Sequence, residues 1–142
     1  MRVYFDASVL IAAILSPNGG SAQLLKFIKK GLIVGIASQT VIEEVLEEDH
    51  LQKIKRSKGE IERFIAQSAL LVRKRITGDE TTVYENLVDE EDSHLIAGAN
   101  LTKCQYLVTL DKKHLLLPDI KEKFLPLRIV SPKELLEEMV TK

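Results

Sequence analysis

Two aspartates directly follow apolar runs that have the composition of β-strands. Asp6 follows residues 1–5, and Asp111 follows residues 106–110. In an open parallel α/β sheet, ligands bind beyond the carboxyl ends of the strands. If these two strands are neighbours, their spacing of about 4.8 Å brings the two carboxylates close together. Because such carboxylates repel each other, the pair indicates a site for a hard divalent cation, Mg²⁺ or Mn²⁺, which prefers oxygen ligands.

Further acidic residues lie where helices begin or flank an apolar face. On a helical wheel, Asp92 falls near the middle of the apolar stripe of the helix that follows it. A charged side chain is not expected in such a stripe unless it has a specific role. A helix N-cap or first-turn acid is the alternative interpretation of Asp92. Glu43 and Glu44 flank the apolar face of their helix about equally, so geometry alone does not choose between them. A solvated helix face is the alternative for either one.

Size and composition predict one globular domain over residues 1–142. Hydrophobic residues make up 45% of the chain and charged residues 29%, which excludes the disordered and fibrous classes. The longest apolar runs fall short of the roughly 20 residues that span a bilayer, so we expect no membrane segment. Asp6 interrupts the only apolar stretch that could form a signal-peptide core, and Cys104 has no second cysteine to pair with. We therefore expect a cytoplasmic protein.

The periodicity of apolar residues predicts alternating strands and helices. Residues 127–130 form a last strand, and Ser131, Pro132 and Glu134 carry the signature of a capped helix start. Residues 81–84 are a weak strand candidate, and residues 112–114 a short helix. The alternation predicts a parallel sheet of four or five strands covered by helices on both faces. The expected strands are 1–5, 32–37, 106–110 and 127–130, and the longer expected helices are 9–15, 21–30, 57–75 and 92–101.

Over almost its whole length, the chain resembles the PIN domain family and, within it, the VapC-like branch of toxin–antitoxin nucleases. The opening VYFDASVLIAAILSPNGGSAQLL is similar to that branch's start, with Ala7 and Ser8 in place of Thr and Asn. IASQTVIEEVLEE resembles the second acidic motif, in a register that favours Glu44. DEEDSHLIAGA resembles the third motif and YLVTLDKKHLL the fourth, although Lys112 and Lys113 stand where the family often has a second Asp.

The resemblance implies a three-layer α/β/α fold and the hydrolysis of RNA by metal-activated water. The ligands of Mg²⁺ (or Mn²⁺) would be Asp6, Asp92 and Asp111, and Glu44 would complete the catalytic acids. Ser8 and Thr109 would orient a carboxylate, a water or a phosphate oxygen by hydrogen bonding. The expected contacts to the RNA backbone are Lys112 and Lys113, because they adjoin the site. His94 and His114 lie close by in sequence, but neither the chemistry nor the family requires them.

The same family also suggests partners and a non-enzymatic alternative. A cognate antitoxin and a homodimer are the expected protein partners. The alternative is a PIN-fold protein that binds RNA or a partner without cutting. A phosphoaspartyl enzyme of the haloacid-dehalogenase type would need a second acid two residues after Asp6, where Ser8 stands.

Overall fold

A five-stranded parallel sheet forms the centre of the protein in the computed structural model, which describes residues 1–141. The strand order is β3-β2-β1-β4-β5, and each neighbouring pair is parallel. This confirms the predicted parallel α/β sheet. The strands are β1 (Arg2–Phe5), β2 (Val34–Ser38), β3 (Leu71–Arg73), β4 (Tyr106–Val108) and β5 (Arg128–Val130).

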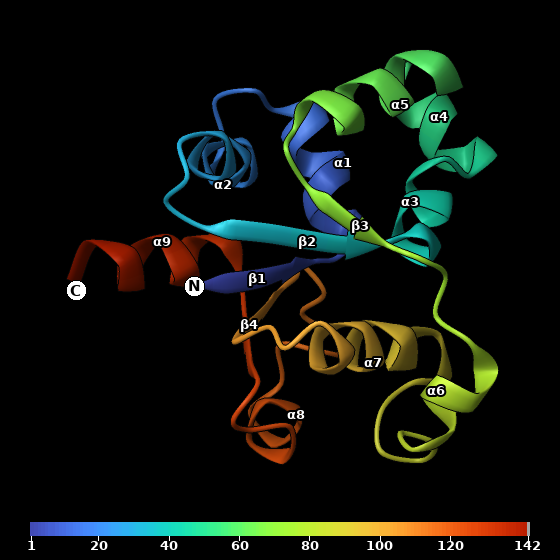
Figure 1. Ribbon diagram of the computed structural model, residues 1–142, viewed down its shortest axis with the longest axis vertical. Helices are drawn as coiled ribbons and strands as arrows, with labels where there is room; N and C mark the ends of the chain where they lie inside the picture. Colours follow the sequence, from blue (N-terminus) through green and yellow to red (C-terminus); the bar gives the residue numbers. More distant parts are fainter. Residues whose placement is uncertain (142) are drawn as a thin grey trace.

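Helices cover both faces of this sheet and complete the predicted three layers (Figure 1). On one side lie α1 (Ala7–Leu15), α2 (Gly20–Lys29), α3 (Gln39–Val45), α4 (Glu48–Ile54) and α5 (Lys58–Gln67). On the other side lie α6 (Gly78–Thr82), α7 (Ser93–Leu101) and α8 (Pro118–Lys123), with the 3-10 turn η1 (Glu90–Asp92) leading into α7. The last helix, α9 (Pro132–Thr141), packs against α2.

The central strands are almost entirely apolar because helices cover them on both faces. Val3, Tyr4 and Phe5 of β1 are fully buried, as are Leu107 and Val108 of β4. These strands join the inward faces of α1, α2 and α7 in one hydrophobic core. The predicted N-cap of α9 is confirmed: Glu134 N donates to Ser131 Oγ at 3.1 Å, and Ser131 N donates to the Glu134 carboxylate at 3.0 Å.

The prediction of one long helix over residues 57–75 is wrong, because the segment contains α5 followed by strand β3. The helix ends where Ser68 Oγ bonds to the Ile65 carbonyl and Ala69 adopts a φ of +67°. Leu71 and Val72 then form an edge strand that leaves them 56% and 43% exposed. Leu71 and Val72 are consecutive apolar residues and do not alternate with polar ones, as residues of a half-buried strand do. The apolar spacing of the preceding helix therefore appeared to continue through them.

Three shorter segments also differ from the prediction. Residues 81–84 are not a strand, because Thr77 and Glu80 form a capping box that starts helix α6 at Gly78. Residues 112–114 form a turn instead of a short helix. The loop expected between β4 and β5 contains α8, which begins with Pro118 in its first turn.

Among residues 1–141, no single helix is long and apolar enough to cross a membrane. The consecutive helices α1 and α2 reach that length and composition only when they are taken together, and they meet at a bend of 99°.

Candidate active site

The sheet topology brings the ends of β1 and β4 side by side. The chain runs outward from β1 through β2 to β3, then crosses back and adds β4 and β5 on the other side of β1. β1 and β4 therefore flank the point where the strand order reverses, which is where open α/β sheets bind ligands. Phe5 pairs with Val108, and the backbone N–H of Asp6 donates to the Val108 carbonyl at 3.1 Å.

Asp6 is 7% exposed, and two hydroxyl groups hold its carboxylate. Its Oδ2 accepts hydrogen bonds from Thr109 Oγ1 at 2.7 Å and from Ser8 Oγ at 3.0 Å. Each hydroxyl also accepts a backbone N–H from the loop after β4: Ser8 Oγ that of Leu110, and Thr109 Oγ1 that of Asp111. Burial raises the pKa of Asp6, and these two hydrogen bonds oppose the rise. Ser8 and Thr109 thus orient a carboxylate and tie the two strand ends together.

Asp111 closes the turn that follows β4. Its Oδ1 accepts the backbone N–H groups of Lys113 and His114, both at 3.0 Å. Its Oδ2 lies 3.3 Å from Nδ1 of the His114 ring. The turn therefore fixes both the carboxylate and the histidine three residues later.

Asp92 occupies the N-cap position of α7, but its side chain makes no capping hydrogen bond. Its pKa is raised from 3.8 to about 6, first by burial and then by the negative charges of Asp111 and Asp6. A simple capping aspartate would be held by helix N–H groups, which favour its charged form. Asp92 instead faces other carboxylates, so the cluster holds more negative charge than its surroundings compensate.

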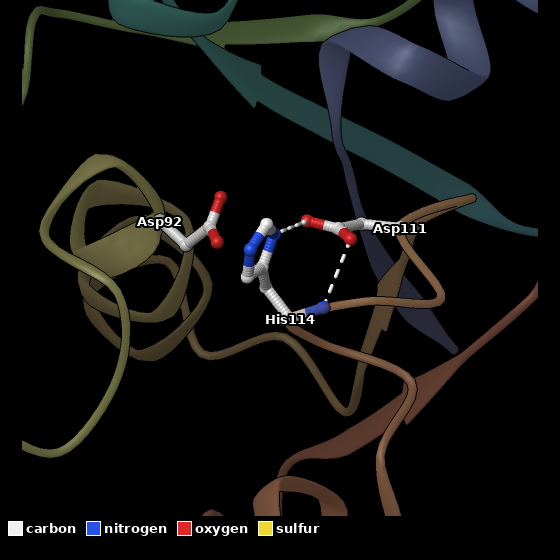
Figure 2. A group of neighbouring side chains, drawn as sticks. All are labelled: Asp92, Asp111 and His114. Carbon is white, nitrogen blue, oxygen red and sulfur yellow. Dashed lines mark hydrogen bonds and ion pairs between the residues drawn. The ribbon is translucent and has the colours of Figure 1, made fainter.

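A carboxylate oxygen of Asp92, one of Asp111 and a ring nitrogen of His114 all lie within 4.8 Å of one another. Figure 2 shows the His114 ring between the two carboxylates. Two donors of one octahedral cation are about 3 to 4 Å apart, so small rotations of these side chains would let all three bind one ion. The donor chemistry and the surplus of negative charge both fit a divalent cation. Asp6 borders this group and contributes to its field.

Glu44, not Glu43, reaches the acidic side chains. Glu44 Oε1 lies 2.5 Å from Nε2 of His94, whose side chain is only 12% exposed, and the charge of Glu44 raises the pKa of Asp6. Glu43 forms an ion pair with the exposed Arg75. The structure thus separates two residues that the helical wheel treated as equivalent.

His94 and His114 both contact acids of the cluster, and the sequence did not reveal this. His94 lies at the start of α7 and meets Glu44 of α3, a contact between elements far apart in the chain. For His114, the only signal in the sequence was its position three residues after Asp111, in a polar segment that forms a turn. Lys112 and Lys113 are exposed beside Asp111, and neither ammonium group forms an ion pair with any residue of the described chain.

Residues 2–113 match the PIN domain family. The chain belongs to the PIN domain family. It is 25% identical to the uncharacterized protein MJ1680 of Methanocaldococcus jannaschii over 142 residues, which cover 97% of this chain and 91% of that protein. A chain of similar fold occurs in the crystal structure of VapBC2 from Rickettsia felis bound to a DNA fragment from their promoter. That chain superimposes with a TM-score of 0.62 at 17% identity, over 92% of this chain and 98% of its own.

Proposed function

We propose that this PIN-domain protein is an endoribonuclease that depends on a divalent metal ion and hydrolyses RNA phosphodiester bonds. The observation that carries the proposal is the acidic group at the strand-order reversal. Asp92 and Asp111 belong to one set of converging donors, the charge of Asp6 raises the pKa of Asp92, and the charge of Glu44 raises that of Asp6. PIN-family membership and an acidic cluster that fits Mg²⁺ or Mn²⁺ support it. A bound cation would activate a water molecule and stabilise the charge that develops on the phosphate.

Each residue of the candidate site has a defined part in the proposed reaction. Asp6, Asp92 and Asp111 would hold the cation, and Glu44 contributes negative charge next to Asp6. Ser8 and Thr109 keep the Asp6 carboxylate in one orientation through their hydrogen bonds to Oδ2. Lys112 and Lys113 bind backbone phosphates beside the site, a contact that positions the RNA without reading its sequence.

The protein partners belong to the same proposal. The solved VapBC2 complex, which shares the fold, supports an antitoxin that binds this chain in the manner of a toxin–antitoxin pair. Homodimerisation stays a prediction from the family resemblance. The apolar positions Ile61 and Ile65 of α5, which could have formed an interface, are buried within the chain's own core.

The test is cleavage of a mixed single-stranded RNA pool by purified protein with Mg²⁺ or Mn²⁺, with and without EDTA. We expect cleavage that EDTA abolishes and that a matched DNA pool does not reproduce. The melting temperature is measured in parallel, because an ion that binds only the folded state raises it; at about 100 times the Kd, the gain is about 2.7 kcal/mol. RNA binding without cleavage and without a metal effect on melting would favour the non-catalytic alternative.

A further inference from the structure

His114 is held at the centre of the acidic cluster by the turn after β4. Asp111 Oδ1 accepts the backbone N–H of His114 at 3.0 Å, and Asp111 Oδ2 lies 3.3 Å from the ring Nδ1. The ring therefore projects toward Asp92, and its nitrogen lies within 4.8 Å of a carboxylate oxygen on either side (Figure 2). A cation that binds Asp92 and Asp111 must either displace this ring or use its nitrogen.

The geometry favours use of the nitrogen. The side chain of His114 is 52% exposed, so a ring nitrogen can meet an ion without a large cost of desolvation. Histidines that bind metals commonly donate their other ring N–H to a carboxylate, which fixes the ring, and Asp111 already lies beside Nδ1. The other two histidines face Glu44, His94 through its carboxylate and His50 through its backbone carbonyl, and neither belongs to the group of converging donors.

We infer that His114 is a nitrogen ligand of the catalytic cation and makes this site bind Mn²⁺ in preference to Mg²⁺. The inference rests on the proposed function and assigns it a metal preference. Mg²⁺ demands oxygen ligands and gives up its waters reluctantly, whereas first-row transition metals accept imidazole readily. An imidazole between two carboxylates therefore shifts the preference of an otherwise all-oxygen site.

Metal binding itself provides the test, through electron paramagnetic resonance of Mn²⁺ titrated into the full-length protein. Free and bound Mn²⁺ are distinguished by their signals, and Mg²⁺ affinity follows from competition. Pulsed measurements on the bound Mn²⁺ detect coupling to a directly bound ¹⁴N nucleus. For the wild-type protein we expect ¹⁴N coupling and a Kd for Mn²⁺ roughly 10-fold or more below that for Mg²⁺.

Two variants and one control separate ligation from structure. His114→Ala should lose the ¹⁴N coupling and weaken Mn²⁺ binding roughly 10-fold, with a smaller effect on Mg²⁺. His114→Asp restores an oxygen donor at the same position, so it should bind Mg²⁺ well but lose both the coupling and the preference. His50→Gln, which removes an imidazole outside the donor group, should keep both.

The outcomes also separate this inference from the proposed function. Wild-type protein that binds Mn²⁺ without ¹⁴N coupling, or coupling that persists in His114→Asp, overturns the role of His114. The proposed function would then still stand if the same protein cleaves RNA with Mg²⁺. Absence of any Mn²⁺ binding overturns the inference, and RNA cleavage that EDTA does not inhibit would separately overturn the metal-dependent mechanism.

Discussion

Asp6 and Asp92 both stand at helix N-cap positions, yet neither side chain caps its helix. Helices α3 and α5, in contrast, begin at Ser38 and Ser57, whose side chains accept a helix N–H in the usual way. The two aspartates give up this stabilising contact. Burial raises the pKa of both carboxylates. The negative charges of Asp111 and Asp6 raise the pKa of Asp92 further, and that of Glu44 raises the pKa of Asp6. Two carboxylates that lack a capping hydrogen bond and have raised pKa values are typical of a functional site.

The raised pKa of Asp92 predicts how the metal-free protein responds to pH. Because the folded state binds this proton more tightly than the unfolded state, its contribution to stability is fully present below pH 3.8 and is lost as the pH rises through about 6. Asp92→Asn lacks this group. In EDTA, its melting temperature should therefore fall less than that of the wild type between pH 5 and 7.5, and exceed it at pH 7.5.

Thermal melts followed by circular dichroism at these two pH values provide the measurement. Mg²⁺ should reverse the order at pH 7.5, because the ion stabilises the wild type and binds the variant weakly. Identical pH dependence of the two melting temperatures would show that the pKa of Asp92 is not raised in the folded protein.

The neighbouring glutamates supply a matched pair of variants. Glu44→Gln removes a charge that acts on Asp6, so RNA cleavage should fall roughly 10- to 100-fold. Glu43→Gln removes only a surface ion pair with Arg75, so the rate should stay within about twofold and stability within about 1 kcal/mol. Single-turnover cleavage rates compare the two. Equal losses in both variants would contradict the assignment of Glu44.

Single site residues could be predicted from the sequence where their neighbours in the chain mark them. Contacts between residues far apart in the chain could not. Asp6 and Asp111 were predictable because each follows an apolar run with the composition of a strand, although β4 itself ends at Val108. The choice of Glu44 over Glu43 came only from resemblance, since the wheel placed both at the border of the apolar face. The meeting of His94 with Glu44 depends on how α7 and α3 approach, which no local pattern encodes.

At the scale of elements, the sequence predicted the buried strands well and the edge poorly. β1 and β4 lie at the centre of the sheet, so their residues are continuously apolar and unmistakable. β3 pairs on one side only and exposes Leu71 and Val72, which leaves no pattern that distinguishes it from the helix before it. Helix α6 was not predicted, because the β-forming residues 81–84 favoured a strand. The capping box of Thr77 and Glu80 instead starts a helix just before them.

The approach of α7 to β1 depends on Gly98. A Cβ at this position would overlap the hydroxyl and ring of Tyr4, which is fully buried in β1. We expect Gly98→Ala to lower the free energy of unfolding by about 1–3 kcal/mol, because the core must shift to admit the methyl group. It should also weaken metal binding, since α7 carries Asp92 at its start.

Gly59→Ala in α5 is the matched control, because a Cβ there would meet no atom within 4 Å. It should be neutral or stabilise the protein by up to about 1 kcal/mol, as expected for alanine in a helix. Urea unfolding of the two variants provides the comparison. An unchanged stability in Gly98→Ala would mean that α7 can move away from β1 freely.

At the scale of the whole molecule, the order of strands explains why distant residues meet. Asp6, Asp92 and Asp111 are spread over more than one hundred residues, and they converge because β1 lies between β2 and β4 at the reversal of the strand order. The alternation of strands and helices predicted the class of fold, but not which strands are neighbours. Adjacency of β1 and β4 was the assumption on which the predicted metal site depended, and the pairing of Phe5 with Val108 confirms it.

The acidic active site is tested most directly by the rate of RNA cleavage by Asp6→Asn beside the wild type, with both proteins purified identically and assayed in Mg²⁺ and in Mn²⁺. Asn keeps the shape of the side chain and the contacts with Ser8 and Thr109, but removes the charge. We expect the same fold by circular dichroism and a rate at least about 100-fold lower, because the cation loses a carboxylate at the reacting centre. Cleavage by Asp6→Asn at the wild-type rate would contradict the assignment of this acidic cluster as the active site.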